Sequence, residues 1–190
     1  METDLVFFDG LASISKSAKA LGTETIAICR HFRDTQEVKS LKEKIFGQKF
    51  DFKTCHILLK PDSRELKKFE NSADLIAVKG GTIKTNKFAV SSKGVDFLIS
   101  PCTSGKTEFD IGIARIAAEN KVEVCFSLSE LLGAKPFQSS LLLKNWLLAA
   151  KMCKKFRGKC SVYSCANSVS EMRSREDLKS FEALLGLTSS

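Results

Sequence analysis

Residues Val95–Leu128 read "VDFLISPCTSGKTEFDIGIARIAAENKVEVCFSL" and decide the fold class. Two short apolar runs, rich in Val, Ile and Phe, flank a segment in which Phe109, Ile113 and Ala117 recur at helical spacing. Short continuous apolar runs are typical of strands buried on both faces, as in a parallel sheet. A strand, a helix and a second strand in this order predict two parallel strands joined by a right-handed crossover.

The same unit recurs along the whole chain. Apolar runs of this kind begin at Leu5, Thr25, His56, Asp74, Val95, Val122 and Cys160. Helical segments lie between them, and Asp34, Asp62 or Ser63, and Ser174 are suitable N-caps. About seven strand–helix repeats predict one α/β domain over residues 1–190, as either an open doubly wound sheet or a closed barrel. The regularity favours a TIM-like (βα) barrel with nearer seven strands than eight.

The longest helical segment covers residues 139–158. Its spacing predicts a buried face formed by Leu141, Leu148, Met152 and Phe156. Lysines repeat on another side of the same segment, at positions 144, 151 and 155.

The composition excludes several classes of protein. No run reaches the roughly 18 apolar residues of a membrane span, and the first residues lack the pattern of a secretory signal. The seven cysteines are scattered through apolar runs, which indicates core residues in a reducing compartment. We therefore expect no membrane partner and a cytoplasmic location, or a nuclear one in a eukaryote.

The positive charge is concentrated in one segment. The net charge is +8, and nine basic residues but only one acid lie between Leu131 and Arg175. The rest of the chain carries equal numbers of basic and acidic residues. A localised positive surface attracts phosphate backbones. A solvated, lysine-rich face is the alternative that charge alone leaves open.

The Gly-Lys-Thr sequence at residues 105–107 resembles part of a phosphate-binding loop. Ser100 stands where that loop needs glycine, and Pro101 removes a backbone donor. Glu108 and Asp110 place negative charge where the phosphate would lie. We predict a polar connector that caps a helix, with Lys106 as at most a surface cation.

No metal signature is present. The two histidines, His31 and His56, belong to no metal-binding motif, and the spacing of Cys153, Cys160 and Cys165 matches no common zinc site. We predict His56 as a hydrogen-bonded core residue and His31 as an exposed residue at the barrel rim.

Reactive groups of a barrel enzyme project from the carboxyl ends of strands. Here these positions hold Asp9, Arg30, His31, Lys60, Lys79, Ser100, Ser127 and Ser164. They offer no carboxylate pair and no nucleophile with its base, so we predict no catalytic residue. A metallo-phosphoesterase or small-molecule enzyme using Asp9, His31 and Lys60 remains the alternative.

An ordered set of motifs carries a family resemblance. The set comprises "VDFLI", then Asp110, Ala114 and Ala117, then "VEVCFSL", "VYSCA", "MRSREDL" and a final "LLGL". Together they resemble the barrel-type protein subunit of archaeal and eukaryotic ribonuclease P, which trims the 5′ leader from precursor tRNA. The resemblance runs in order from about Asp74 to Thr188 and more loosely through the first third.

The resemblance implies a distorted sevenfold barrel of the polymerase-and-histidinol-phosphatase type. Metal-dependent members of that superfamily carry His-x-His after the first strand, where this chain reads "FFDGLAS". It therefore implies a non-catalytic subunit that binds and stabilises the catalytic RNA and holds no cofactor, with Mg²⁺ at the RNA. The implied partners are ribonuclease P RNA, precursor tRNA indirectly, and a small α/β subunit in a heterodimer or a two-plus-two assembly.

Structured RNA is recognised mainly through its shape and backbone, so we expect cations rather than aromatic side chains to bind it. The predicted RNA-binding residues are Arg173, Arg175, Lys79, Lys84, Lys87, Lys154, Lys155, Arg157 and Lys159.

Overall fold

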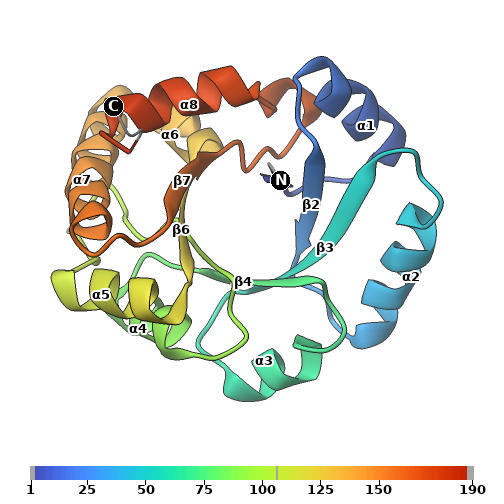
Figure 1. Ribbon diagram of the computed structural model, residues 1–190, viewed down its shortest axis with the longest axis horizontal. Helices are drawn as coiled ribbons and strands as arrows, with labels where there is room; N and C mark the ends of the chain where they lie inside the picture. The colour runs from blue at the N-terminus through green and yellow to red at the C-terminus, as the bar shows by residue number, and fades with distance from the viewer. Residues whose placement is uncertain (1–2, 106, 188–190) are drawn as a thin grey trace.

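The computed structural model describes residues 3–105 and 107–187. Seven parallel strands form one sheet in sequential order. They are β1 (Thr3–Val6), β2 (Thr25–Arg30), β3 (Asp51–Leu58), β4 (Leu75–Lys79), β5 (Phe97–Ile99), β6 (Glu123–Ser127) and β7 (Cys160–Tyr163). Figure 1 shows the strands as a ring with the helices packed around its outside. The predicted TIM-like sevenfold barrel is confirmed.

The helices cover the outer face of this ring (Figure 1). They are α1 (Leu11–Ala20), α2 (Thr35–Ile45), α3 (Ser63–Phe69), α4 (Ile83–Ser91), α5 (Ile111–Asn120), α6 (Leu128–Gly133), α7 (Pro136–Lys155) and α8 (Arg175–Leu184), with a 3₁₀ turn, η1 (Val169–Glu171). Asp34, Asp62 and Ser174 cap α2, α3 and α8 as the sequence predicts. In the described part of the chain, no helix is both long and apolar enough to cross a bilayer.

Two helices were not predicted. α4 buries Asn86 beside Ala89 and Val90, so its inward face lacks a clear apolar period. α6 follows β6 without a break and is six residues long, too short for a helical period to show.

The barrel interior combines many small side chains with a few large ones. The inner cluster consists of Leu5, Ala27, Cys29, Cys55, Ile57, Ala77, Phe97, Ile99, Cys125, Tyr163 and Cys165. All seven cysteines of the chain are free, and six are buried, which confirms their prediction as core residues. A seven-stranded barrel is narrower than the common eight-stranded one, so alanine and cysteine fit where larger side chains would clash.

The buried face of α7 differs from the prediction. The helix buries Leu142, Trp146, Ala149, Ala150 and Cys153. Leu148 is 38% exposed, and the Trp146 ring packs 5.2 Å from the Phe126 ring, measured between centroids. The predicted stripe was wrong because almost every position from 141 to 150 is apolar, so more than one stripe satisfies the spacing.

The ring closes between the first and last strands through very few contacts. Val6 forms an isolated parallel bridge with Ala166, and the Phe7 N–H donates to the Ala166 carbonyl at 2.8 Å. The Asp4 carboxylate accepts from the Ser164 N–H at 2.8 Å and from its own neighbour, the Leu5 N–H, at 2.9 Å. Asp4 is 2% exposed, and burial raises its pKa. The buried Asp4 side chain thus replaces part of the backbone hydrogen bonding that is missing between β1 and β7, and we call this junction the seam.

We expect Asp4→Ala to lower the free energy of unfolding by about 1–3 kcal/mol, because it leaves the buried Ser164 N–H without an acceptor. Asp4→Asn keeps an acceptor oxygen and should lose less. Urea denaturation followed by circular dichroism measures both variants. An Ala variant as stable as the parent chain would show that Asp4 does not hold the seam.

Candidate nucleic-acid interface

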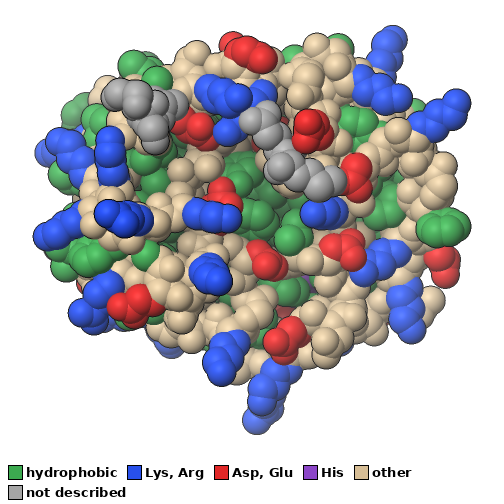
Figure 2. Space-filling model, in the orientation of Figure 1, with side chains coloured by type: hydrophobic (Ala, Val, Ile, Leu, Met, Phe, Trp, Pro, Cys, Tyr) green, Lys and Arg blue, Asp and Glu red, His purple; other side chains and the backbone are tan. Residues whose placement is uncertain are grey.

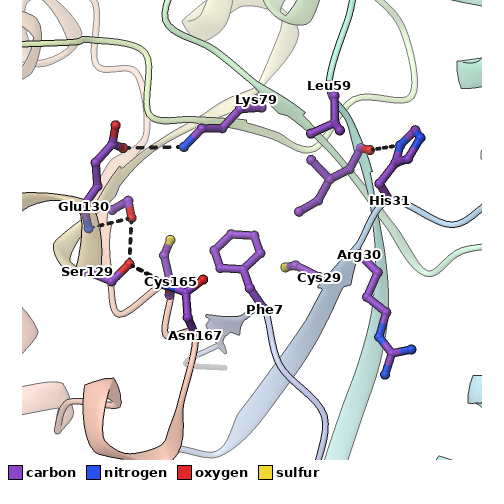
Figure 3. Close-up of a pocket in the computed structure, with 12 residues that line it drawn as sticks. Phe7, Cys29, Arg30, His31, Leu59, Lys79, Ser129, Glu130, Cys165 and Asn167 are labelled. Carbon is purple, nitrogen blue, oxygen red and sulfur yellow. Dashed lines mark hydrogen bonds and ion pairs between the residues drawn. The ribbon is translucent and has the colours of Figure 1, made fainter. Parts of the chain in front are cut away.

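The carboxyl ends of the strands surround an open cavity of about 720 Å³. Its lining residues are Phe7, Cys29, Arg30, His31, Ile57, Leu59, Lys79, Ser127, Ser129, Glu130, Cys165 and Asn167. Figure 3 shows Phe7 near the middle, with Arg30 and His31 on one side and Glu130, Ser129 and Asn167 on the other. We call this cavity the barrel mouth.

Each cation of the barrel mouth already has an acidic neighbour. Arg30 forms an ion pair with Asp9. Lys79 Nζ lies 3.5 Å from Glu130 Oε2 and donates to Ser100 Oγ at 3.1 Å. The mouth is therefore polar and mixed in charge, rather than strongly positive.

The mouth lacks an activated nucleophile among the described residues. Burial raises the pKa of the Cys29 and Cys165 thiols, which keeps them protonated and unreactive. Ser127 and Ser129 have no imidazole or carboxylate as a hydrogen-bond partner; the Ser129 hydroxyl instead donates to the Cys165 carbonyl at 2.8 Å. The described thiols and hydroxyls of the mouth therefore do not form a pair of nucleophile and general base.

Asp9, His31 and Lys60, the residues of the alternative enzyme hypothesis, do not converge. Asp9 lines a separate hollow between α1 and α2, and only His31 lines the barrel mouth. Lys60 is exposed and lines neither. The other rim positions serve the fold, since Ser164 Oγ accepts from the Arg173 N–H at 3.0 Å and Ser100 is buried in the left-handed conformation.

One cluster of potential metal ligands was not predicted, because its residues are far apart in the sequence. Ligand atoms of His31, His56 and Glu65 lie within 4.8 Å of one another. His56 is fully buried, its Nδ1 accepts from the Phe32 N–H at 3.3 Å, and its Nε2 faces Glu65 Oε1 at 2.8 Å. His31 is exposed at the rim, and both histidine predictions are confirmed.

The hydrogen bonds of His56 disfavour a metal ion at this cluster. In neutral imidazole one nitrogen carries the proton, and here Nδ1 is the acceptor, so Nε2 carries it and donates to Glu65. A metal at Nε2 would force the proton onto Nδ1, facing the Phe32 N–H. The cluster is better described as a buried histidine oriented by a carboxylate, and absence of metal remains a prediction.

Burial lowers the pKa of His56, so the folded protein keeps this side chain neutral at pH values where the unfolded chain is protonated. Neutral His56 therefore contributes to the free energy of unfolding above the unfolded pKa of about 6.5, and this contribution is lost as the pH falls below that value. We expect His56→Gln, which cannot titrate, to flatten the decline of unfolding free energy between pH 7 and pH 5. Denaturant titrations across this range test it, and identical slopes would contradict it.

Two buried asparagines hold the Gly-Lys-Thr loop. Asn86 Nδ2 donates to the carbonyls of Pro101, at 2.8 Å, and Glu108, at 2.7 Å. Asn145 Nδ2 donates to the carbonyls of Thr103, at 2.8 Å, and Gly105, at 3.1 Å. The loop is thus a connector whose carbonyl groups are held by the two asparagines. After it, Asp110 caps α5 by accepting a hydrogen bond from the Ile113 N–H. The loop is therefore not a phosphate cradle, and Lys106 lies outside the described residues.

The predicted RNA-binding residues lie at opposite ends of the barrel. Lys154, Lys155, Arg157 and Lys159 occupy the end of α7 and the loop before β7, at the amino ends of the strands. At the carboxyl ends, Lys79 is the last residue of β4, and Lys84 and Lys87 lie on the helix that follows it. Arg173 and Arg175 follow β7. No single flat surface can include both groups.

Several carboxyl-end cations are committed to the fold. Arg175 is largely buried in an ion pair with Glu182, at 3.3 Å between Nη1 and Oε1. Arg173 Nη1 donates to the carbonyls of Ser170 and Met172, at 2.8 and 2.9 Å. Lys84 and Lys87 are exposed on α4. The guanidinium groups here fix the segment between β7 and α8.

The amino-end group extends along α7 into a larger surface. Lys144, Lys151 and Lys155 recur on one side of the helix, are all exposed, and are joined by Lys154, Arg157 and Lys159. We call these six residues the α7 cationic surface. Within the described residues, no acid forms an ion pair with any of the six, although Lys154 Nζ donates to the Gly186 carbonyl at 3.0 Å. Figure 2 shows Lys and Arg side chains gathered on the side of the molecule where α7 lies.

Some basic residues of the structure were not among those predicted to bind RNA. Lys144 and Lys151 were recognisable from their seven-residue spacing along a helix. Arg33, Arg64 and Lys68 line a hollow beside the rim. They come from two separate loop–helix junctions, so no local pattern in the sequence could have connected them.

Comparisons with known proteins agree with this architecture. Residues 9–190 match the protein-family model described as RNase P subunit p30. "Ribonuclease P protein component 3" of Thermococcus kodakarensis is 34% identical over 158 residues, covering 81% of this chain and 71% of that protein. The protein of the same name from Methanothermobacter thermautotrophicus is 30% identical over 162 residues, covering 81% and 65%. A chain in the cryo-EM structure of archaeal ribonuclease P with mature tRNA superposes with a TM-score of 0.82, at 21% identity over 97% of this chain and 82% of that one.

Proposed function

The chain belongs to the RNase P subunit p30 family, and we propose that it binds and stabilises the catalytic RNA of ribonuclease P through the α7 cationic surface. This enzyme is a ribonucleoprotein that matures tRNA. No described residue of the barrel mouth is an activated nucleophile, which supports a role for this subunit other than bond cleavage. Precursor tRNA is then bound through the assembled particle.

The α7 cationic surface is the observation that carries the proposal. Its residues are exposed and without acidic partners in the described chain, so a phosphate can bind each of them without breaking an ion pair. Lys144 and Lys155 are eleven residues apart, which places them about 16 Å apart along the helix. Such a row follows the backbone of a folded RNA and reads its shape rather than its bases.

Lysine supplies most of this charge, and its ammonium group binds phosphate as a point charge without fixed geometry. Folding of a large RNA brings many phosphates together, and the repulsion between them opposes compaction. Protein cations and Mg²⁺ ions at the RNA would both reduce this repulsion. We therefore propose that the subunit lowers the Mg²⁺ concentration that the particle requires, without holding the ion itself.

We expect the quadruple variant Lys154→Gln, Lys155→Gln, Arg157→Gln and Lys159→Gln to bind ribonuclease P RNA at least about tenfold more weakly at 0.1 M salt. The slope of log affinity against log salt should fall by about one for each phosphate that the variant no longer neutralises. Filter binding across a salt series measures both quantities.

A matched control removes four exposed lysines from α1, α2 and α3, away from α7, by Lys16→Gln, Lys19→Gln, Lys39→Gln and Lys67→Gln. The control should keep the affinity of the parent chain. Reconstitution with RNA and the other protein subunits then measures leader removal at several Mg²⁺ concentrations. An unchanged affinity and Mg²⁺ requirement in the quadruple variant would refute the assignment of this surface.

We also propose that a small α/β protein subunit docks on the carboxyl-end side of the barrel. Ile83, Ile111 and Phe137 stand at or next to the first residues of α4, α5 and α7, and Leu132 lies near the end of α6; all four are exposed. α4 packs on α5 and α5 on α7, so these apolar side chains belong to neighbouring helices. Apolar side chains gathered outside the core are typical of protein contacts rather than of RNA contacts.

Phe137→Ser combined with Ile111→Ser should weaken this complex at least about tenfold, because large apolar side chains dominate such interfaces. Sedimentation of the purified subunit pair measures the change. The control is Phe46→Ser, because Phe46 is 88% exposed at the end of α2, on the amino-end side. Equal weakening by both variants would place the partner elsewhere.

A further inference from the structure

The barrel mouth is large enough for a ligand and is not explained by RNA backbone binding on α7. Its volume of about 720 Å³ falls within the range of small-molecule sites, which is roughly 300–1,000 Å³. It lies where ligands bind in barrel proteins, at the carboxyl ends of the strands. Its chemistry differs from that of the α7 cationic surface, because apolar and polar groups alternate around it.

An aromatic ring lies at the centre of this cavity. Phe7 extends from the end of β1 into the mouth, where Figure 3 shows its ring between the two polar walls. Ile57 lies beside it, and Leu59 is 54% exposed at the rim. Trp146 and Tyr163 are buried elsewhere, so Phe7 is the partly exposed ring of the mouth on which a flat ligand can stack.

One wall of the mouth carries a partly exposed carboxylate. Glu130 lines the mouth with its side chain 37% exposed, while its buried Oε2 forms an ion pair with Lys79 Nζ at 3.5 Å. On the same wall, Asn167 Nδ2 donates to Glu171 Oε2 at 3.0 Å and to Ser129 Oγ at 3.4 Å. A carboxylate acceptor beside amide, ammonium and hydroxyl groups suits the edge of a nucleobase that bears an amino group.

The opposite wall carries exchangeable positive charge. Arg30 pairs with Asp9, and the two side chains are 36% and 69% exposed. An ion pair this exposed contributes little stability, so a phosphate can replace the Asp9 carboxylate at low cost. Arginine then binds the phosphate through its planar guanidinium.

We propose that the barrel mouth binds one nucleotide, with its base stacked on Phe7 and hydrogen-bonded to Glu130, and its phosphate directed to Arg30. The inference rests on the proposed RNA-binding function, because an unpaired nucleotide of the bound RNA is one source of this ligand. A free mononucleotide has the same chemistry and is the other source. The site holds the nucleotide without reacting with it.

Equilibrium dialysis of the full chain with AMP, CMP and UMP tests the site directly. We expect the amino-bearing AMP and CMP to bind more tightly than UMP, and Phe7→Leu to weaken both at least tenfold. Glu130→Gln should reduce the preference over UMP, because the variant replaces a carboxylate acceptor with an amide. The matched control is Phe46→Leu, which removes an exposed ring at the other end of the barrel and should change nothing.

A second arm uses ribonuclease P RNA substituted with 8-azidoadenosine, whose base keeps the amino group, and identifies photo-crosslinked peptides by mass spectrometry. Crosslinks to β1 or to the residues following β3 that disappear in Phe7→Leu would identify the RNA as the source of the nucleotide. Mononucleotide binding without such crosslinks would identify a free nucleotide as the ligand.

Two results together overturn the inference. The first is that mononucleotides fail to bind, or bind to Phe7→Leu as tightly as to the parent chain. The second is that no crosslink reaches the mouth. The proposed function survives that result provided that the quadruple α7 variant still weakens RNA binding. If the parent chain does not bind the RNA at all, the proposed function fails as well, so the two failures are distinguishable.

Discussion

The closure of the strand ring between β1 and β7 is the constraint on which the other features depend. One main-chain bridge, between Val6 and Ala166, joins the first and last strands and includes the hydrogen bond from the Phe7 N–H to the Ala166 carbonyl. The buried Asp4 carboxylate supplements it. A parallel sheet left open at this seam would expose unpaired backbone groups and the apolar interior. Once the seam is closed, the carboxyl ends of all strands meet around one mouth, and every helix is held outside. Phe7, which completes the seam through its backbone, is also the ring at the centre of that mouth.

The small side chains of the interior follow from the same closure. A narrow ring accommodates a few large side chains, such as Ile99, because many of the others are small, among them Ala27, Cys29, Cys55 and Ala77. Burial raises the pKa of the Cys29 and Cys125 thiols and keeps them protonated, so their chemistry is suppressed and they act as small apolar groups. The interior is thus inert, and what the molecule can do is determined at its rim and on its outer helices.

These two regions differ in how they treat charge. At the rim, several cations bind carboxylates or backbone carbonyls, as in the Arg175–Glu182 pair, and they fix loops. On α7, lysines extend into solvent without acidic partners in the described chain. The same residue types therefore stabilise the fold at one end and remain available to an anionic partner at the other. Under the proposed function, this separation leaves the α7 cationic surface available to RNA.

The sequence by itself determined the sevenfold α/β barrel, most caps and the excess of charge, because strand runs, cap residues and composition are local signals. It also indicated the connector at residues 100–110, because Pro101 removes a donor and Glu108 and Asp110 place negative charge there. The prediction from Ser100 was wrong, since Ser100 adopts the left-handed conformation that glycine favours. Only the tertiary structure decided the buried face of α7, the His31–His56–Glu65 cluster, the carbonyl contacts of Asn86 and Asn145, and the division of the cations between opposite ends. The physical reason is that each of these features depends on contacts between segments that are far apart in the sequence. The closed ring brings those segments together, and the spacing of residues along the chain does not predict which of them meet.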